Sequence, residues 1–223
     1  MTRKETLDEP LPRPSIAYVD EMQDERDNFY GDAYESNLFE KIHLVHPKPN
    51  LNELVNDLIE LRIDALVTDF NLSEAAPLSY NGEQLVSAFL AARSDFPCFI
   101  RTSFDDAALH SSDDVNRVYS KNVANEEIAG RNLFKRIALQ IEHHRRRSKE
   151  WQDELQSLLE KDPAQRTIAD VDRIVELDSK IEASLAKDMA ISERVKKGLF
   201  DKESKLIEET ERLIAEIKNA LGE

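Results

Sequence analysis

The chain has 223 residues, with 45 acidic against 30 basic side chains and a formal net charge of −15 at pH 7. This charge argues against nonspecific binding to nucleic acid, which requires lysine and arginine to neutralise phosphates. One cysteine excludes a disulfide framework within the chain, and no apolar run is long enough to span a bilayer. We therefore expect a cytoplasmic protein with no membrane partner, for which nucleic acid is an unlikely partner.

Alternating strand and helix patterns occupy the first half of the chain. Residues 1–14 are charged and proline-rich, unlike a signal peptide, and are expected to form a disordered arm. Short apolar runs predict strands at residues 16–19, 42–45, 65–68, 98–101 and 117–120. Helices are predicted at 23–38, after a cap at Asn50 or Asn52, after Gly82, and briefly within 105–114. The alternation predicts an α/β domain with a doubly wound, five-stranded parallel sheet.

Functional groups stand at the ends of four of these strands: Asp20 and Glu21, Asp69, Thr102, and Lys121. The carboxyl ends of parallel strands meet at one edge of a sheet, so these groups are expected to converge there. Closely spaced carboxylates repel one another, and a divalent cation such as Mg²⁺ relieves that repulsion. A cation and a lysine would neutralise an incoming phosphoryl group, and an aspartate carboxylate can act as its nucleophile.

This arrangement resembles the receiver domain of two-component response regulators, over about residues 14–145. The acidic pair Asp20-Glu21, the central Asp69, the strand-four Thr102 and the strand-five Lys121 carry the resemblance. It implies a flavodoxin-like fold in which Asp69 accepts a phosphoryl group that Thr102 and Lys121 contact. It also implies that Mg²⁺ is bound by Asp20, Glu21, Asp69 and the Asn71 carbonyl. A sensor histidine kinase or phosphotransfer protein would be the donor, and catalysis would be limited to the domain's own phosphorylation and dephosphorylation.

The sequence departs from the family pattern at several positions. Asn122 follows the lysine where proline is usual, and the family's aromatic position holds Val118, with Tyr119 one residue later on the opposite strand face. Arg101 replaces an apolar residue, and the stretch 73–81 is longer than usual. These departures leave open a pseudo-receiver that acts as a phosphorylation-independent scaffold. A phosphatase-type enzyme ranks last, because position 71 is asparagine and not a second acid.

The remaining sequence is helical in pattern. A seam with steps of three and four residues comprises Phe134, Ile137, Ile141, His144, Ser148, Trp151, Leu155 and Leu158. Asp162-Pro163 should end this helix, a second should span about 164–188, and a third should carry Leu199 to Leu221. We expect residues 146–223 to form a helical bundle or coiled coil that dimerises, with fold-back or a partner protein as alternatives. The basic run 143–147 is either a solvated helix face or a contact for an acidic partner, a phosphate or nucleic acid.

Overall fold

The computed structural model describes residues 12–73, 78–103, 110, 112, 114–121, 126–185 and 212. Contacts divide the chain into two compact units, Met1–Leu90 with Phe96–His144 (unit 1) and Ala91–Asp95 with Arg145–Glu223 (unit 2). The predicted arm up to residue 11, most of the predicted short helix at 105–114 and the predicted third C-terminal helix lie outside the described residues.

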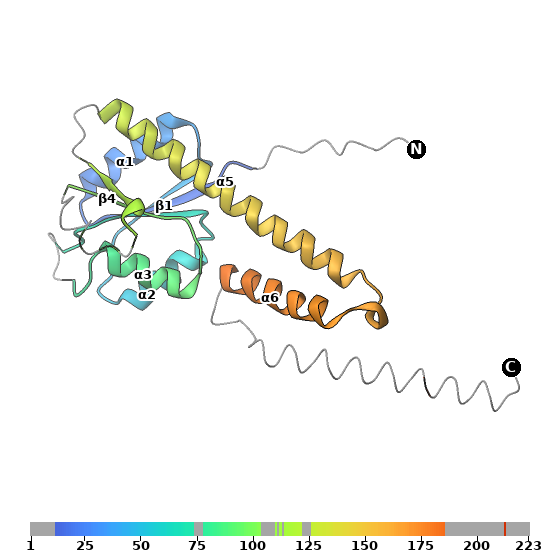
Figure 1. Ribbon diagram of the computed structural model, residues 1–223. Coiled ribbons are helices and arrows are strands. Elements are labelled where there is room, and N and C mark those ends of the chain that lie inside the picture. The colour runs from blue at the N-terminus through green and yellow to red at the C-terminus, as the bar shows by residue number, and fades with distance from the viewer. Residues whose placement is uncertain are drawn as a thin grey trace, which may run out of the picture. The chain divides into compact units, whose positions relative to one another are not determined.

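Unit 1 is built on one parallel sheet of five strands in the order β2-β1-β3-β4-β5 (Figure 1). The strands are β1 (Ser15–Val19), β2 (Lys41–Val45), β3 (Ala65–Asp69), β4 (Cys98–Thr102) and β5 (Val118–Ser120). Each neighbouring pair is parallel. This is the flavodoxin-like order, in which ligands bind outside the carboxyl ends of the strands. The predicted fold class is confirmed.

Helices cover both faces of this sheet. Helix α1 (Gln23–Ser36) and the first part of α5 (Glu126–Leu159) lie on one face, while α2 (Leu51–Glu60) and α3 (Gly82–Ala92) lie on the other (Figure 1). The core on the α1/α5 face is formed by Ile16, Tyr18, Phe29, Ala33, Phe39, Ala65, Val67, Phe99, Leu133, Phe134, Ile137 and Ile141. Alternate residues of each strand enter this core, as the two-residue period of a strand requires.

Two helix boundaries follow from asparagines. The side chain of Asn50 accepts hydrogen bonds from the backbone N–H groups of Asn52 and Glu53, so Asn50 is the cap of α2. Helix α1 was predicted to reach residue 38 but ends at Ser36. The reason is that Asn37 adopts a left-handed backbone with φ 53° and its N–H bonds to the Tyr34 carbonyl, which closes the helix.

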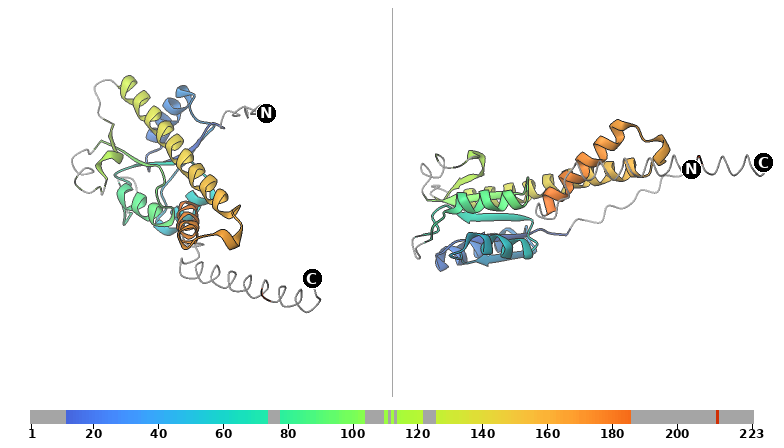
Figure 2. Two further views of the ribbon diagram at one scale, coloured as in Figure 1. Left: turned by 45° about the vertical axis from the view of Figure 1, so that its right-hand side comes forward. Right: turned by 90° about the horizontal axis from the view of Figure 1, so that it is seen from below.

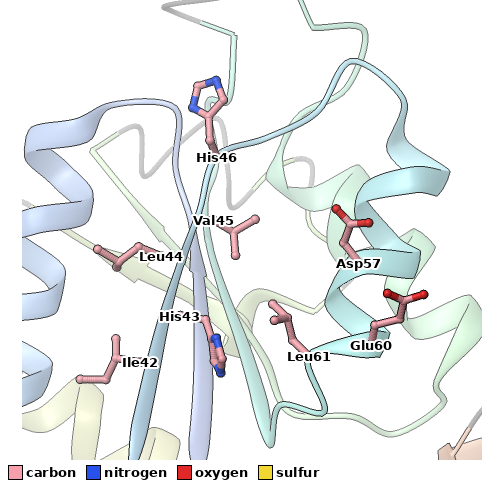
Figure 3. Close-up of a pocket in the computed structure, with 8 residues that line it drawn as sticks. All are labelled: Ile42, His43, Leu44, Val45, His46, Asp57, Glu60 and Leu61. Carbon is pink, nitrogen blue, oxygen red and sulfur yellow. The ribbon is translucent and has the colours of Figure 1, made fainter.

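Strand β2 lies at one edge of the sheet, beside an open groove. Figure 3 shows Ile42 and Leu44 on one side of the strand and His43 and Val45 on the other, next to Leu61. The groove is lined by Ile42, His43, Leu44, Val45, His46, Asp57, Glu60 and Leu61. None of the predicted site residues is in this lining, so the groove is separate from the candidate site.

Unit 2 contains the second part of α5, a short 3₁₀ turn (Pro163–Gln165) and α6 (Ile168–Leu185). Its first helix was predicted to end at 162–163 and its second to begin at 164, but the structure has Leu159 and Ile168 at these ends. A capping box explains the later start. The Thr167 N–H donates to the Asp170 carboxylate at 2.9 Å, and the Asp170 N–H donates to the Thr167 hydroxyl at 3.2 Å.

The two helices of unit 2 fold back on each other. The Arg173 guanidinium donates two hydrogen bonds of 2.7 Å to the Glu154 carboxylate. Cations of Arg147 and Lys180 each lie 5.8 Å from the Trp151 ring centroid. The Arg173–Glu154 and Lys180–Trp151 contacts join α5 to α6 within one chain, whereas Arg147 and Trp151 both belong to α5. Figure 2 shows the ribbons of the two helices side by side. Homodimerisation remains a prediction.

The short segment 91–95 belongs to unit 2 through its backbone contacts. The Ser94 N–H donates to the Ala183 carbonyl at 2.9 Å, and Nε of Arg93 donates to the Ser184 carbonyl at 3.1 Å. None of the described helices is long and apolar enough to cross a membrane.

Candidate functional site

Asp69 is the last residue of the buried strand β3 and is itself buried. Its Oδ2 accepts a hydrogen bond of 2.8 Å from the Asn71 N–H, which begins the turn after the strand. Further along the chain, Gly82 at the start of α3 lies next to the end of β3, because its N–H donates to the Phe70 carbonyl at 2.8 Å. A Cβ atom on Gly82 would overlap the carbonyl oxygen of Asp69, so only glycine lets α3 begin this close to the aspartate.

Lys121, directly after β5, bridges three carboxylates. Its ammonium nitrogen lies 2.8 Å from Oδ1 of Asp69 and 3.2 Å from Oδ2 of Asp20. It also lies 3.1 Å from Oε2 of Glu25. The Lys121 backbone N–H donates to the Thr102 carbonyl at 2.7 Å, which holds the lysine beside the end of β4. We call Asp20, Asp69 and Lys121 the carboxylate pocket.

Asp20 is the most enclosed member of this pocket, with 1% of its surface exposed. Its Oδ2 accepts hydrogen bonds from the Tyr18 hydroxyl at 2.6 Å and from Lys121. Its Oδ1 accepts from the Met22 N–H at 2.9 Å. Both oxygens are therefore engaged, as a buried charge requires.

The electrostatics of the pocket follow from burial and opposite charge. Burial raises the pKa of Asp69, although the hydrogen bond and charge of Lys121 oppose that rise. Burial alone would lower the pKa of Lys121, but its hydrogen bond and charge interaction with Asp69, followed by Asp20, give a net rise. Burial, followed by the charge of Asp20, raises the pKa of Tyr18, so its hydroxyl stays protonated and donates.

The structure therefore brings Asp20, Asp69 and Lys121 together, as the strand ends indicated. Thr102 is fully buried at the end of β4, and Glu21 is buried beside Asp20. The role of each residue in phosphoryl transfer stays a prediction.

Sequence reasoning missed two members of the site, Tyr18 and Glu25. A signal existed for both. Tyr18 precedes Asp20 by two positions and so shares its strand face, and Glu25 lies in the first turn of α1.

The donor atoms suit Mg²⁺, because that ion prefers one or two carboxylates together with water. Asp20 and Asp69 would supply these oxygens. In this conformation, however, Lys121 occupies the space between them. Among the described residues, no group of three or more histidine, cysteine, aspartate or glutamate side chains is arranged to hold a metal. The donor chemistry of Asp20 and Asp69 thus suits Mg²⁺, and binding of the ion stays a prediction.

Unit 1 combines the strand order 2-1-3-4-5 with an acid-and-lysine pocket at the carboxyl ends of β1, β3 and β5. The fold is flavodoxin-like, as the resemblance to receiver domains implied. In unit 1 Arg101 is half-buried, with its guanidinium carbon 6.0 Å from the Phe29 ring centroid. Tyr119 packs against the core of the α1/α5 face, and its ring centroid lies 5.8 Å from that of Phe99.

No family model matches the sequence, and no curated protein is detectably similar to it. Similar solved structures include the two-component response regulator RcsB in complex with DNA, at 14% identity and a TM-score of 0.40, covering 78% of this chain and 92% of that chain. Another is RcsB from Salmonella enterica serovar Typhimurium bound to a promoter in the presence of phosphomimetic BeF3⁻, at 13% identity and a TM-score of 0.39. That match covers 85% of this chain and 99% of the other.

The fold assignment of unit 1 rests on its strand order and not on these two proteins. Both are bound to DNA in those structures, and neither tests our expectation that nucleic acid is an unlikely partner of this chain. That expectation stays a prediction from net charge.

Proposed function

We propose that this chain is a phospho-accepting response regulator in which Asp69 receives the phosphoryl group. The observation that supports this most directly is the Lys121 ammonium, 2.8 Å from Asp69 and 3.2 Å from Asp20 at the sheet edge. A lysine in that place neutralises charge where a phosphoryl group would arrive, and such preorganised charge is a large part of phosphoryl-transfer catalysis.

The chemistry assigned to the chain is limited. An oxygen of the Asp69 carboxylate attacks phosphorus, the bond between phosphorus and the donor's histidine nitrogen breaks, and an acyl phosphate forms. Lys121 pairs with the phosphoryl oxygens, and the Thr102 hydroxyl donates a hydrogen bond to one of them. Asp20, Glu21, Asp69 and the Asn71 carbonyl would hold Mg²⁺, which would supply further positive charge at the phosphoryl group. The protein otherwise performs no reaction beyond its own phosphorylation and dephosphorylation.

The output is a change in helical protein–protein interactions. Helix α5 begins in the receiver domain and continues without a break to Leu159. A shift between two states of the receiver surface therefore alters a helix that also carries the contacts of unit 2. The donor is a sensor histidine kinase or a phosphotransfer protein.

Intact-protein mass spectrometry tests this function. With Mg²⁺ and acetyl phosphate, or with a phosphohistidine donor, the full chain should gain one phosphoryl group. Asp69→Asn should gain none, whereas Asp57→Asn should behave as the parent, because Asp57 pairs with Lys48 on the surface. A parent chain that gains no phosphoryl group from either donor would contradict the proposal.

A pseudo-receiver is the second candidate. The specific observation in its favour is Arg101, a half-buried cation within β4 at a position where the family has an apolar residue. In that case the parent and Asp69→Asn would both remain unmodified, and both would bind the same partner with equal affinity.

A further inference from the structure

Tyr18 connects the carboxylate pocket to the interior of unit 1. Its hydroxyl lies 2.6 Å from Oδ2 of Asp20, the same oxygen that Lys121 contacts at 3.2 Å. Tyr18 has no exposed surface, so its hydroxyl depends on a protein partner. A phenylalanine at position 18 would fill most of the volume of the tyrosine ring without burying a hydroxyl. The tyrosine oxygen is therefore a specific link to a charged group of the pocket.

Beyond its hydroxyl, Tyr18 begins a chain of aromatic contacts. Its ring is stacked on that of Phe29 in α1, with centroids 4.0 Å apart and an angle of 13° between the planes. The Phe29 ring meets Phe134 of α5 edge-on, with centroids 5.3 Å apart. Exposed fractions of the three residues are 0%, 0% and 3%. A close-packed path of this kind leaves no space for one ring to move without its neighbour.

We propose that Tyr18 is a positioning residue that couples the state of Asp20 to helix α5 through Phe29 and Phe134. When Asp20 changes partner, the buried hydroxyl has to follow the carboxylate or lose its acceptor. Either response moves a ring that is packed against α1 and, through Phe29, against α5.

The physiological trigger, phosphorylation at Asp69, rests on the proposed function; the coupling between Asp20 and α5 does not. Asp69 and Asp20 share the Lys121 ammonium. A phosphoryl group on Asp69 that draws this lysine away would therefore leave Asp20 with a different set of partners. Coupling of this type is carried by packed side chains that have alternative arrangements.

Methyl NMR of the full chain tests the coupling without any phosphodonor. The reporters are the buried side chains of Ile137 and Ile141 on α5. Asp20→Ala should shift these resonances, and in a Tyr18→Phe background that response should fall at least two-fold. Asp20→Asn, which keeps the shape of the side chain, replaces Asp20→Ala if the latter does not fold. Equal responses in the two backgrounds would overturn the proposal.

A matched variant separates coupling from loss of packing. Leu54→Ala on α2 also removes buried atoms, but it lies on the opposite face of the sheet and should leave the response to Asp20→Ala unchanged. If Leu54→Ala reduces the α5 methyl response to Asp20→Ala as much as Tyr18→Phe does, the reduction reflects a general loss of core packing, and the role of Tyr18 is overturned.

A phosphorylation arm distinguishes this inference from the proposed function. The parent and Tyr18→Phe are brought to the same phosphoryl stoichiometry with Mg²⁺ and acetyl phosphate, as measured by intact mass, and the α5 methyl response of Tyr18→Phe should then be at least two-fold smaller. If the parent gains no phosphoryl group, the proposed function fails, and the cycle of Tyr18→Phe with Asp20→Ala still decides the coupling. Equal α5 responses on phosphorylation would count against Tyr18.

Discussion

Lys121 and Asp69 form an ion pair of 2.8 Å whose side chains are only 12% and 9% exposed. The two residues differ in what happens to the remaining charge when one of them is removed. Lys121 has further partners in Asp20 and Glu25, so it stays neutralised if Asp69 is lost. Without Lys121, in contrast, the carboxylates of Asp69 and Asp20 share an enclosed site with no cation between them. Removing the cation is therefore more costly than removing the anion.

Lys121→Met should destabilise the fold by roughly 3 kcal/mol, because it leaves buried carboxylates without a cation. Urea denaturation of the full chain measures the free energy of unfolding. Lys48→Met is the control: the Lys48–Asp57 pair is 43% and 45% exposed, and such pairs contribute about 0 to 1 kcal/mol. If the two variants lose the same free energy, the pocket lysine has no special structural role.

Asp69→Asn should be more stable than the parent at neutral pH. Burial raises the folded-state pKa of Asp69 above its ordinary value of 3.8, so the folded parent binds a proton more readily than the unfolded chain. Its free energy of unfolding therefore falls as pH rises from 3.8 through the raised pKa, and it is level above that. Asparagine does not ionise and avoids this fall. Urea titrations should show a difference at pH 7 that disappears below 3.8; a less stable variant at pH 7 would contradict this account.

Gly82→Ala should destabilise unit 1 by about 1–3 kcal/mol, because its Cβ overlaps the Asp69 carbonyl oxygen and either α3 or β3 has to move. Gly31→Ala is the matched control in the exposed middle of α1, where a Cβ meets nothing within 4 Å. That change should stabilise the protein by about 0.5–1 kcal/mol, from helix propensity alone. Thermal melts compare the two, and a neutral Gly82→Ala would show that the close approach is relaxed in solution.

The Asp170 carboxylate should titrate near pH 2. A hydrogen bond from Lys161 at 2.7 Å, followed by those from Thr167, lowers its pKa to about 2. Because this pKa lies below the ordinary value of 3.8, the stabilising contribution is present above 3.8 and is lost as pH falls towards 2. NMR of the side-chain carboxyl carbon measures the midpoint. Lys161→Met should move it upward, and an unmoved midpoint would remove Lys161 as the cause.

The full chain is predicted to be a homodimer through its helical region, measured by light scattering. Trp151 is a sensitive position for this test, because the cations of Arg147 and Lys180 lie 5.8 Å from its ring. Trp151→Lys places a third cation between them and should open the α5–α6 contact, whereas Trp151→Glu would gain two ion-pair partners. Faster amide exchange in α6 should accompany dissociation. A parent that stays monomeric at high concentration would exclude self-association and leave fold-back or a partner protein.

The amino-acid sequence by itself determined the flavodoxin-like architecture of unit 1. Apolar runs such as 65–68 are too short for helices, and the helical patterns between them enforce parallel strands. Parallel strands point their carboxyl ends to one edge, so Asp20, Asp69 and Lys121 had to converge. Periodicity also placed Tyr119 on the strand face opposite to that of Val118, and the structure showed that its ring centroid lies 5.8 Å from that of Phe99.

Only the tertiary structure decided which groups pair within that convergence. Hydrogen-bond partners depend on side-chain rotamers and on separations of a few tenths of an ångström, which no residue pattern specifies. The contact of Tyr18 with Asp20 and the contact of Glu25 with Lys121 are of this kind. The contact of α6 with α5 was also decided by the tertiary structure, because an apolar seam is equally well covered by the same chain, a second copy or a partner. The periodicity of the seam shows that one helix face must be buried, and only the arrangement of the whole chain selects what covers that face.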